Sequence, residues 1–379
     1  MKAAGLIFSN IHDACVPELT KPRTMASIPF GGRYRLIDFT LSNMVNSDIT
    51  TVGVITHNNY QSLLDHIGTG KDWDLARRSG GIRILPPFIT SSAGANHNKL
   101  YTTRLEALVG VKDFVLNCGE DTIVMADCDM ICNIDFTDAI EQHQKTGADL
   151  TIISKRINTE DLAFPLDSKI DIIKFNEDKR IVDYQEYDSQ QGELYINMNV
   201  VIVNRKYLLD VINEATSRGY VSFTHQVLIK NFARDKFFVY EYEGFFEYID
   251  SMQKYFYCNM EMLDSDKRKE VFNVNNRPVY TKVRNTPPTR YTEDAKVSNS
   301  IIADGCVIEG VVENSILFRG VKVGKGTVIK NSILLQNTYT GKDVYLNCVV
   351  TDKNVTIKDG KMLSGHETLP FYISKGTTV

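Results

Sequence analysis

Two stretches near the N-terminus bear on whether the chain can bind phosphates. Residues 29–39, PFGGRYRLIDF, form a glycine and arginine turn that leads into a helix. Residues 4–20, AGLIFSNIHDACVPELT, form a first strand and turn with no glycine after Gly5. A first turn that binds nucleotide phosphates needs small residues, because only a bare backbone brings its N–H groups against phosphate oxygens. The pattern indicates a nucleotide-handling fold that has lost its nucleotide loop.

A second group of candidate residues follows the apolar run DTIVMAD. Cys128 and Cys132 lie four positions apart beside Asp127 and Asp129, which could suggest a metal site. No second cluster completes four ligands, so small side chains buried at a strand end are the favoured interpretation of the cysteines. The seven cysteines, an odd number without metal-type pairs, predict reduced thiols in a reducing compartment.

Length and composition limit the architecture and the partners. At 379 residues the chain exceeds one ordinary core, so two domains are expected. The formal net charge is -4, and no basic excess points to nucleic acid. The apolar start MKAAGLIF is too short for a signal segment or a membrane span, which predicts a cytoplasmic protein without a membrane partner.

Residues 1–257 have the pattern of an α/β domain. Short β-branched runs alternate there with polar, helix-like stretches; the runs are AAGLIF, TVGVIT, DTIVMAD, DLTIISK, LYINMNVVIV and KFFVYEY. Strands buried on both faces between crossover helices look like this, so a mixed, mostly parallel sheet is predicted. Residues 258–290 are predicted to connect two domains, because the stripe YFYCNMEML has helical spacing and PPTRY is typical of a linker.

Residues 291–379 carry a repeat. Aliphatic residues recur every six positions, at Ile302 and Ile308, at Val323, Ile329 and Leu335, and at Ile357 and Leu363. A period of six predicts a parallel β-helix with triangular coils, whereas the alternative, an antiparallel sandwich, would repeat every two. A stacked solenoid has open ends and flat faces that must be covered, so the tail also predicts an oligomer.

Taken together, the two halves resemble a known family. The motifs FGGRYRLIDFTLSN and HIGTGKDWDLARRSGGIRILPP and the six-residue repeat resemble ADP-glucose pyrophosphorylase, also called glucose-1-phosphate adenylyltransferase. The resemblance implies a Rossmann-like, GT-A-like nucleotidyltransferase domain followed by a left-handed β-helix that helps to build a tetramer. It also implies the Mg²⁺-dependent joining of ATP and glucose 1-phosphate to ADP-glucose and pyrophosphate, for glycogen biosynthesis.

Several positions depart from the family's working parts. The phosphate loop GGxGxRL of the family corresponds to Gly5–Asp13, GLIFSNIHD, which lacks the later glycines and the arginine. A family lysine falls at Met25, and the lysine of FVEKP falls at Tyr187. The family's GTADA corresponds to Thr103–Ala107, where the first side chains would crowd a base. The resemblance therefore implies little or no turnover by this chain alone.

A few working positions of the family keep a usable side chain. Asp127 matches the family's first metal-binding and catalytic aspartate, whereas the second metal position matches Tyr248 in FEYIDS. Asp250 lies two residues after Tyr248 and is not counted as a replacement for the second metal-binding aspartate. Glu186 and Asn197 match sugar-binding positions. One carboxylate attracts Mg²⁺ weakly, because the ion usually needs two carboxylates and the substrate phosphates.

Basic residues near the first motif match an effector pocket of the family. Arg23 and Arg35 match positions around that pocket, and Arg33 stands where a lysine is common, while two other basic positions have become prolines. The resemblance implies a regulatory anion site at these arginines. The alternative for Arg33 and Arg35 is an ion pair at a helix start with Asp38.

Three functions remain open on the sequence. The chain resembles the degenerate, GlgD-type subunits of the family, which modulate a catalytic subunit within a hetero-oligomer, and a homo-oligomer is a further outcome. An active sugar-phosphate nucleotidyltransferase with an altered nucleotide loop is the alternative. A hexapeptide acyltransferase is the third, although only His366 beyond the last repeat could act as its base.

Overall fold

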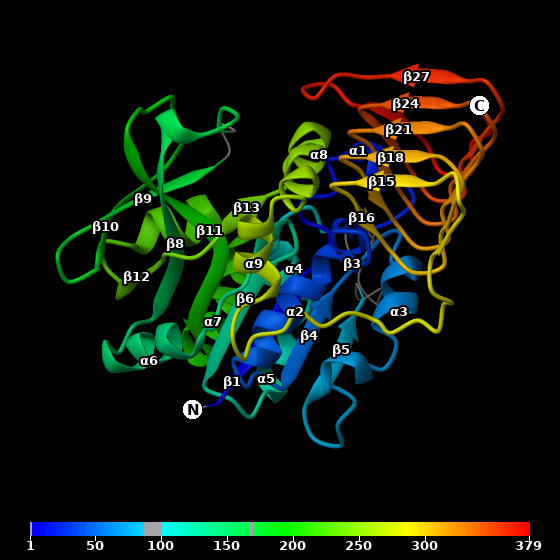
Figure 1. Ribbon diagram of the computed structural model, residues 1–379. Helices are drawn as coiled ribbons and strands as arrows, with labels where there is room; N and C mark the ends of the chain where they lie inside the picture. The colour runs from blue at the N-terminus through cyan, green and yellow to red at the C-terminus, as the bar shows by residue number, and fades with distance from the viewer. Residues whose placement is uncertain (1, 87–100, 167–169) are drawn as a thin grey trace.

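The computed structural model of the protein describes residues 2–86, 101–166 and 170–379 (Figure 1). Pro87, the last residue of the second family motif, lies outside the described residues. Figure 1 shows a sheet flanked by helices and, beside it, a stack of short strands that leads to the C-terminus. None of the helices within the described ranges is long and apolar enough to cross a membrane.

A nine-stranded mixed sheet forms the frame of the first half. Its parallel part has the order β6-β1-β4-β5, with bounds β1 (Ala3–Phe8), β4 (Thr51–Ile55), β5 (Gly81–Leu85) and β6 (Thr122–Asp127). The remaining strands are β8 (Leu150–Asn158), β9 (Asp171–Phe175), β10 (Ile181–Glu186), β11 (Glu193–Asn204) and β12 (Phe237–Tyr242). β11 pairs antiparallel with both β6 and β8, so the run LYINMNVVIV reverses the direction of the sheet. The predicted mixed α/β sheet is confirmed.

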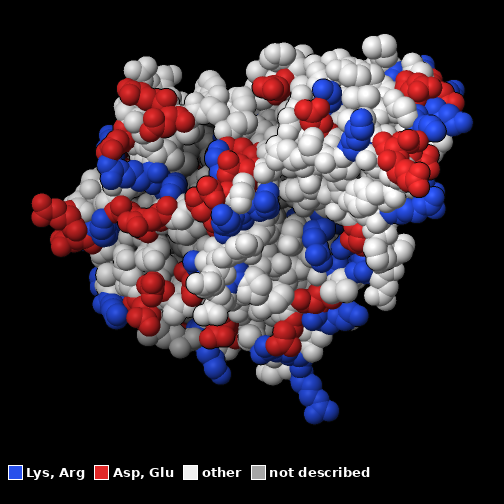
Figure 2. Space-filling view, viewed as in Figure 1, with Lys and Arg blue, Asp and Glu red and all other residues white. Residues whose placement is uncertain are grey.

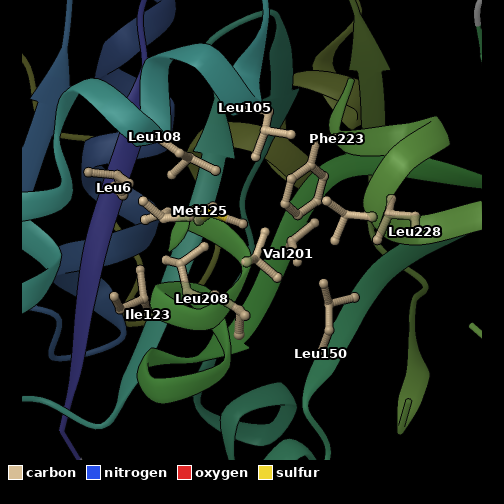
Figure 3. Close-up of a cluster of buried hydrophobic side chains, with 14 of the residues drawn as sticks. Leu6, Leu105, Leu108, Ile123, Met125, Leu150, Val201, Leu208, Phe223 and Leu228 are labelled. Atoms are coloured by element: carbon tan, nitrogen blue, oxygen red, sulfur yellow. The ribbon is translucent and has the colours of Figure 1, made fainter. Parts of the chain in front are cut away.

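Helices cover both faces of this sheet. One core cluster packs α4 (Arg104–Gly110), α5 (Lys112–Asn117) and α7 (Arg205–Arg218) on the sheet; the other packs α2 (Leu36–Asn46), α3 (Gln61–Ile67) and α6 (Thr137–Lys145) on it. Leu6 belongs to the first cluster and Ile7 to the second, because successive side chains of a strand point to opposite faces. Figure 3 shows Leu105 and Leu108 of α4 in the first cluster with Leu6 and Met125.

Short elements complete the first half. They are α1 (Pro17–Thr20), the strand pairs β2 (Pro29–Phe30) with β3 (Tyr34–Arg35) and β7 (Met130–Cys132) with β13 (Phe246–Tyr248), the 3₁₀ turns Met25–Ser27, Lys71–Trp73 and Thr159–Asp161, and the π-helical turn Thr224–Ile229. Trp73 and His66 are buried, and the two rings meet edge to face at 5.7 Å between centroids. His66 and Trp73 of the second family motif therefore pack within the fold.

Two helices and an extended segment join the halves. α8 (Met252–Glu261) and α9 (Ser265–Phe272) precede the segment 273–289. Tyr255 and Phe256 of α8 belong to a buried cluster that also contains Ile316 and Ile333 of the C-terminal half. The helical stripe from Tyr255 therefore packs the two halves together, as its spacing predicted.

The C-terminal half consists of three parallel five-stranded sheets, the arrangement of the predicted left-handed β-helix. The first sheet contains β14 (Arg290–Tyr291), β17 (Val307–Ile308), β20 (Lys322–Val323), β23 (Tyr339–Thr340) and β26 (Thr356–Ile357). The second contains β15 (Lys296–Ser298), β18 (Val311–Glu313), β21 (Val328–Lys330), β24 (Tyr345–Asn347) and β27 (Met362–Ser364). The third contains β16 (Ile301–Ile302), β19 (Ile316–Leu317), β22 (Ile333–Leu334), β25 (Val349–Thr351) and β28 (Phe371–Ile373).

Stacked aliphatic side chains fill the inside of the coils. Val312, Ile329 and Leu346 occupy equivalent positions on β18, β21 and β24 and are fully buried. At one corner Asn299, Asn314 and Asn331 adopt positive φ angles of 38–46°. Asparagine tolerates this left-handed backbone better than most residues, so its recurrence marks the corners of the coils.

Candidate functional site

The candidate site lies at the carboxyl edge of the parallel strands. β1 and β6 pair in register with Phe8 opposite Asp127, so the loop after β1 and the end of β6 meet at one edge of the sheet. Ligands of open α/β sheets bind at that edge. The register of β11 shifts between Asn197 and Val200, and this irregularity places Asn199 beside the end of β6.

Four charged side chains meet at this edge. The Oδ2 atom of Asp127 lies 2.6 Å from His12 Nε2 and 2.6 Å from Arg104 Nη2. His12 Nε2 also lies 3.4 Å from Asp129 Oδ2. We name His12, Arg104, Asp127 and Asp129 the charge cluster. Asn199 joins it, because its Nδ2 donates to Asp129 and its Oδ1 accepts from Arg104.

The cations and anions of the charge cluster stabilise one another. Burial alone would raise the pKa of Asp127, but Arg104 and His12 hold that pKa below its ordinary value. Burial alone would lower the pKa of His12, but Asp129 and Asp127 raise it well above its ordinary value. Burial raises the pKa of Asp129. The contacts of the charge cluster therefore favour the charged forms of His12 and Asp127.

The loop after β1 is fastened by its own polar groups. Asp13 accepts hydrogen bonds from Asn10 Nδ2 at 2.7 Å and from the backbone N–H of Met25 at 2.6 Å. Burial raises the pKa of Asp13 to about 6. Met25, at the family's lysine position, is 1% exposed within an apolar cluster. These contacts hold the loop in place through Asp13 and the buried Met25.

A small cavity lies beside the charge cluster. Its volume is about 140 Å³, and its lining comprises His12, Cys15, Asp129, Ile170, Asp171, Asn197, Asn199, Tyr248, Ile249 and Asp250. Sites for small molecules and cofactors have volumes of about 300–1,000 Å³. This cavity by itself is therefore too small for a nucleotide together with a sugar phosphate.

The predicted sugar-binding residues do not lie together. Asn197 lines the cavity, and its Nδ2 donates to Tyr184 Oη at 3.0 Å, while Tyr184 donates to Asp171 at 2.6 Å. Glu186 is exposed at the end of β10, where its carboxylate lies 3.3 Å from His225 Nε2. Glu186 is not among the residues that line the cavity, so of these two predicted residues only Asn197 lies there.

The donor atoms present do not fit Mg²⁺. His12, Asp127 and Asp129 offer ligand atoms within 4.8 Å of one another, so the outline of a cation site exists. Mg²⁺ requires a nearly octahedral set of oxygen ligands, however, and one carboxylate oxygen of Asp127 already contacts both Arg104 and His12. Tyr248 and Asp250 line the neighbouring cavity but do not belong to this group. The cysteines are also explained, since Cys128 and Cys132 are buried in apolar surroundings.

The three predicted anion-binding arginines have different environments. Arg23 is 1% exposed, and its Nη2 lies 2.6 Å and 2.9 Å from the two carboxylate oxygens of Asp352. The guanidinium of Arg35 donates to Ser62, while its backbone N–H donates to Asp38 at 2.9 Å. Arg33 is exposed over the ring of Tyr34. The helix-start contact with Asp38 is thus made by the backbone of Arg35.

Further basic groups gather at the junction of the halves. Lys353 is largely buried, and its pKa is lowered to about 6 by burial and by the positive charges of Arg35 and Arg23. Arg284 contributes to the positive potential at Arg35, whose pKa is lowered to about 10, chiefly by burial. Elsewhere on the face shown in Figure 2, positive and negative side chains are interspersed. No local sequence signal connects Lys353 and Arg284 to the first motif.

Sequence reasoning missed two members of the charge cluster. It treated His12 as part of a lost loop and Arg104 as a side chain that would crowd a base, whereas both contact Asp127. Thr103 and Glu106 form a capping box at the start of α4, and this box fixes the position of Arg104, the first helical residue. A buried carboxylate needs a counter-charge, which is the one signal that could have prompted a search for these cations.

Comparison with known proteins covers nearly the whole chain. Residues 16–234 match the family described as Nucleotidyl transferase, and residues 287–368 match the family described as GlmU-like, C-terminal hexapeptide. Glycogen biosynthesis protein GlgD of Bacillus subtilis (strain 168) is 33% identical over 372 residues, which cover 98% of this chain and 95% of that protein. Glucose-1-phosphate adenylyltransferase of Geobacillus stearothermophilus is 32% identical over 336 residues, covering 87% and 83%. The enzyme of the same name from Bacillus thuringiensis (strain Al Hakam) is 30% identical over 369 residues, covering 96% and 94%.

Proposed function

Because the chain belongs to the nucleotidyltransferase family that contains glucose-1-phosphate adenylyltransferase and GlgD, we propose that it is a regulatory subunit of that enzyme in glycogen biosynthesis. The observation that carries the proposal is the charge cluster, in which Arg104 and His12 contact the carboxylate that the family uses for catalysis. The proposal includes a cytoplasmic location and a hetero-oligomer, a tetramer, with a catalytic partner.

The chemistry of the reaction argues against turnover by this chain. The phosphate of glucose 1-phosphate attacks the α-phosphorus of ATP, so two anions must meet, and a divalent ion and free cationic side chains must stabilise the charge that develops. Here Arg104 and His12 are held by Asp127, and Met25 and Tyr187 stand at the family's lysine positions. Removal of one such donor typically slows a reaction about a hundred- to a thousandfold. Because several such groups are lost from separate parts of the site, the activity of the chain alone should be near background.

A subunit without turnover can still change its partner's activity. It does so by binding one conformation of the catalytic subunit more tightly than another, which shifts the population toward that conformation. The β-helix and its contact with α8 are retained, so the surfaces through which such subunits assemble have a folded scaffold. Regulation through assembly therefore requires none of the lost catalytic groups.

We also propose that the junction of the halves holds the regulatory anion site. Arg35 supplies its positive potential, Lys353 offers an amine that a bound anion would protonate, and Arg33 is exposed at the edge of the same turn. Arg23 adds to the positive potential at Lys353, but its guanidinium is already engaged by Asp352. An anion that reached Lys353 would favour protonation of the amine and would gain a second positive partner.

The proposal is tested by pyrophosphate release from ATP and glucose 1-phosphate. The chain alone should give activity near background, and its addition to a catalytic glucose-1-phosphate adenylyltransferase should change the maximal rate or the substrate dependence of that enzyme. Serum albumin at the same concentration is the control for non-specific effects. Turnover by the chain alone within about tenfold of the catalytic enzyme would reject the regulatory assignment, because such a rate requires an intact site.

A further inference from the structure

We propose that Arg104 and His12 are built-in counter-ions that take the place of a divalent cation at Asp127 and exclude it. The inference deepens the proposed function, since it rests on the premise that the carboxylates of this site no longer serve catalysis. It assigns Arg104 and His12 a function in this chain. They allow a site inherited from a metal-dependent enzyme to fold and persist without a metal.

Arg104 is held on Asp127 from several sides. Its Nη2 donates to Asp127 Oδ2 at 2.6 Å and to Asn199 Oδ1 at 3.4 Å, and its guanidinium lies over the ring of Phe8, 5.6 Å from the centroid. Its side chain is only 12% exposed. The capping box at Thr103 fixes the helix start from which it extends. A guanidinium held in this way is a fixed cation where a mobile dication would otherwise approach.

His12 acts on the other side of the same oxygen. Its Nε2 lies 2.6 Å from Asp127 and 3.4 Å from Asp129, so the ring bridges the two carboxylates. Asp127 Oδ2 thus contacts both His12 and Arg104. A dication could reach that oxygen only if both side chains moved away.

Charge balance favours the same conclusion. The two carboxylates of the charge cluster face two basic side chains, so each carboxylate has a basic partner without a metal ion. Buried charges are tolerated when they are paired in this way. The Oδ1 atoms of Asp127 and Asp129, for which no hydrogen-bond partner exists among the described residues, are the atoms through which residual metal affinity would act. The test must therefore measure metal binding directly.

The first experiment compares Mn²⁺ binding by the full chain with that of R104Q, H12Q and the double variant, by electron paramagnetic resonance. The wild type should bind Mn²⁺ no more tightly than with a millimolar dissociation constant. The double variant should bind Mn²⁺ about tenfold or more tightly than the wild type, since changes beside a metal site alter its affinity by that factor. Adding D127N to the double variant should abolish this binding. R205Q, a substitution at an arginine far from the site, is the matched control and should behave as the wild type.

The second experiment measures thermal unfolding with Mg²⁺ and with a chelator. Mg²⁺ should raise the unfolding midpoint of R104Q and leave that of the wild type unchanged, because a ligand stabilises only a protein that binds it. R104K keeps a positive charge and should remain insensitive to Mg²⁺. The comparison of R104Q with R104K also keeps the proposal testable if the double variant does not fold.

Two outcomes would overturn the inference. One is wild-type binding of Mn²⁺ as tight as that of the double variant, and the other is folded Arg104 and His12 variants that gain no affinity and no Mg²⁺ stabilisation. Neither measurement involves the catalytic partner, so this inference and the proposed function can fail separately. Metal exclusion without any effect on the partner would reject the regulatory role alone, whereas wild-type metal binding with an intact effect would reject this inference alone.

Discussion

Arg23 and Asp352, which lie 329 positions apart in the sequence, form a buried ion pair between the loop after β1 and the β-helix. Tyr372 reinforces the junction, because its hydroxyl lies 3.1 Å from Asp352 Oδ2 and 2.8 Å from the carbonyl oxygen of Glu18. The loop after β1 is thus tied to the last coils of the solenoid. A displacement of the β-helix by a partner subunit would be transmitted directly to that loop.

The first prediction concerns this ion pair. D352A should destabilise the folded chain by about 3–5 kcal/mol, because it leaves the guanidinium of Arg23 buried without a counter-charge. The double variant R23M/D352L should recover much of the loss. Chemical denaturation measures the effect, and E141A, which removes an exposed partner of Lys145, should change stability by less than about 1 kcal/mol. An unchanged unfolding midpoint for D352A would contradict the assignment of a structural pair.

The second prediction concerns pH and Lys353. Its pKa in the folded chain is about 6, below the ordinary value of 10.5, so between these values the unfolded chain binds one more proton than the folded chain. The free energy of unfolding should therefore rise with pH across this window, with a slope of at most about 1.4 kcal/mol per pH unit from this group. K353M should lack this component. Urea denaturation at a series of pH values measures both slopes, and identical slopes would show that Lys353 titrates normally.

The architecture could be predicted because its signals are local. Leu6 and Ile7 alternate between two cores, and Val323 and Ile329 follow the six-residue period of the coils. Such periodicities are fixed by the geometry of a strand or a coil, so neighbouring residues reveal them.

The contents of the site could not be predicted, because they depend on contacts between distant elements. His12 and Asp127 are 115 positions apart, and Arg104 reaches Asp127 from the start of a different helix. Arg23 matched an anion-binding position, and only the folded chain reveals that Asp352 engages it. Loss of a motif is visible in a sequence, but the side chains that fill the resulting space are not.

The third prediction tests the core of the β-helix. L346A should lower the free energy of unfolding by about 2–5 kcal/mol, because Leu346 is fully buried between Ile329 and Leu363 of the adjacent coils. M362A should change it by less than about 0.5 kcal/mol, since Met362 is 76% exposed. Thermal unfolding followed by circular dichroism would measure both variants. Equal effects of the two substitutions would be incompatible with the stacked core.

The fourth prediction is that restoring the family's lysine at Met25 will not restore catalysis. The Met25 side chain is 1% exposed among apolar neighbours, so M25K would bury an ammonium group and destabilise the chain by about 3 kcal/mol or more. M25L conserves volume and polarity and should change stability by less than about 1.5 kcal/mol. Denaturation and pyrophosphate release, measured on both variants, separate folding from activity. A stably folded M25K protein that released pyrophosphate would mean that the phosphate site survives and that one missing cation, not the charge cluster at Asp127, keeps this chain inactive.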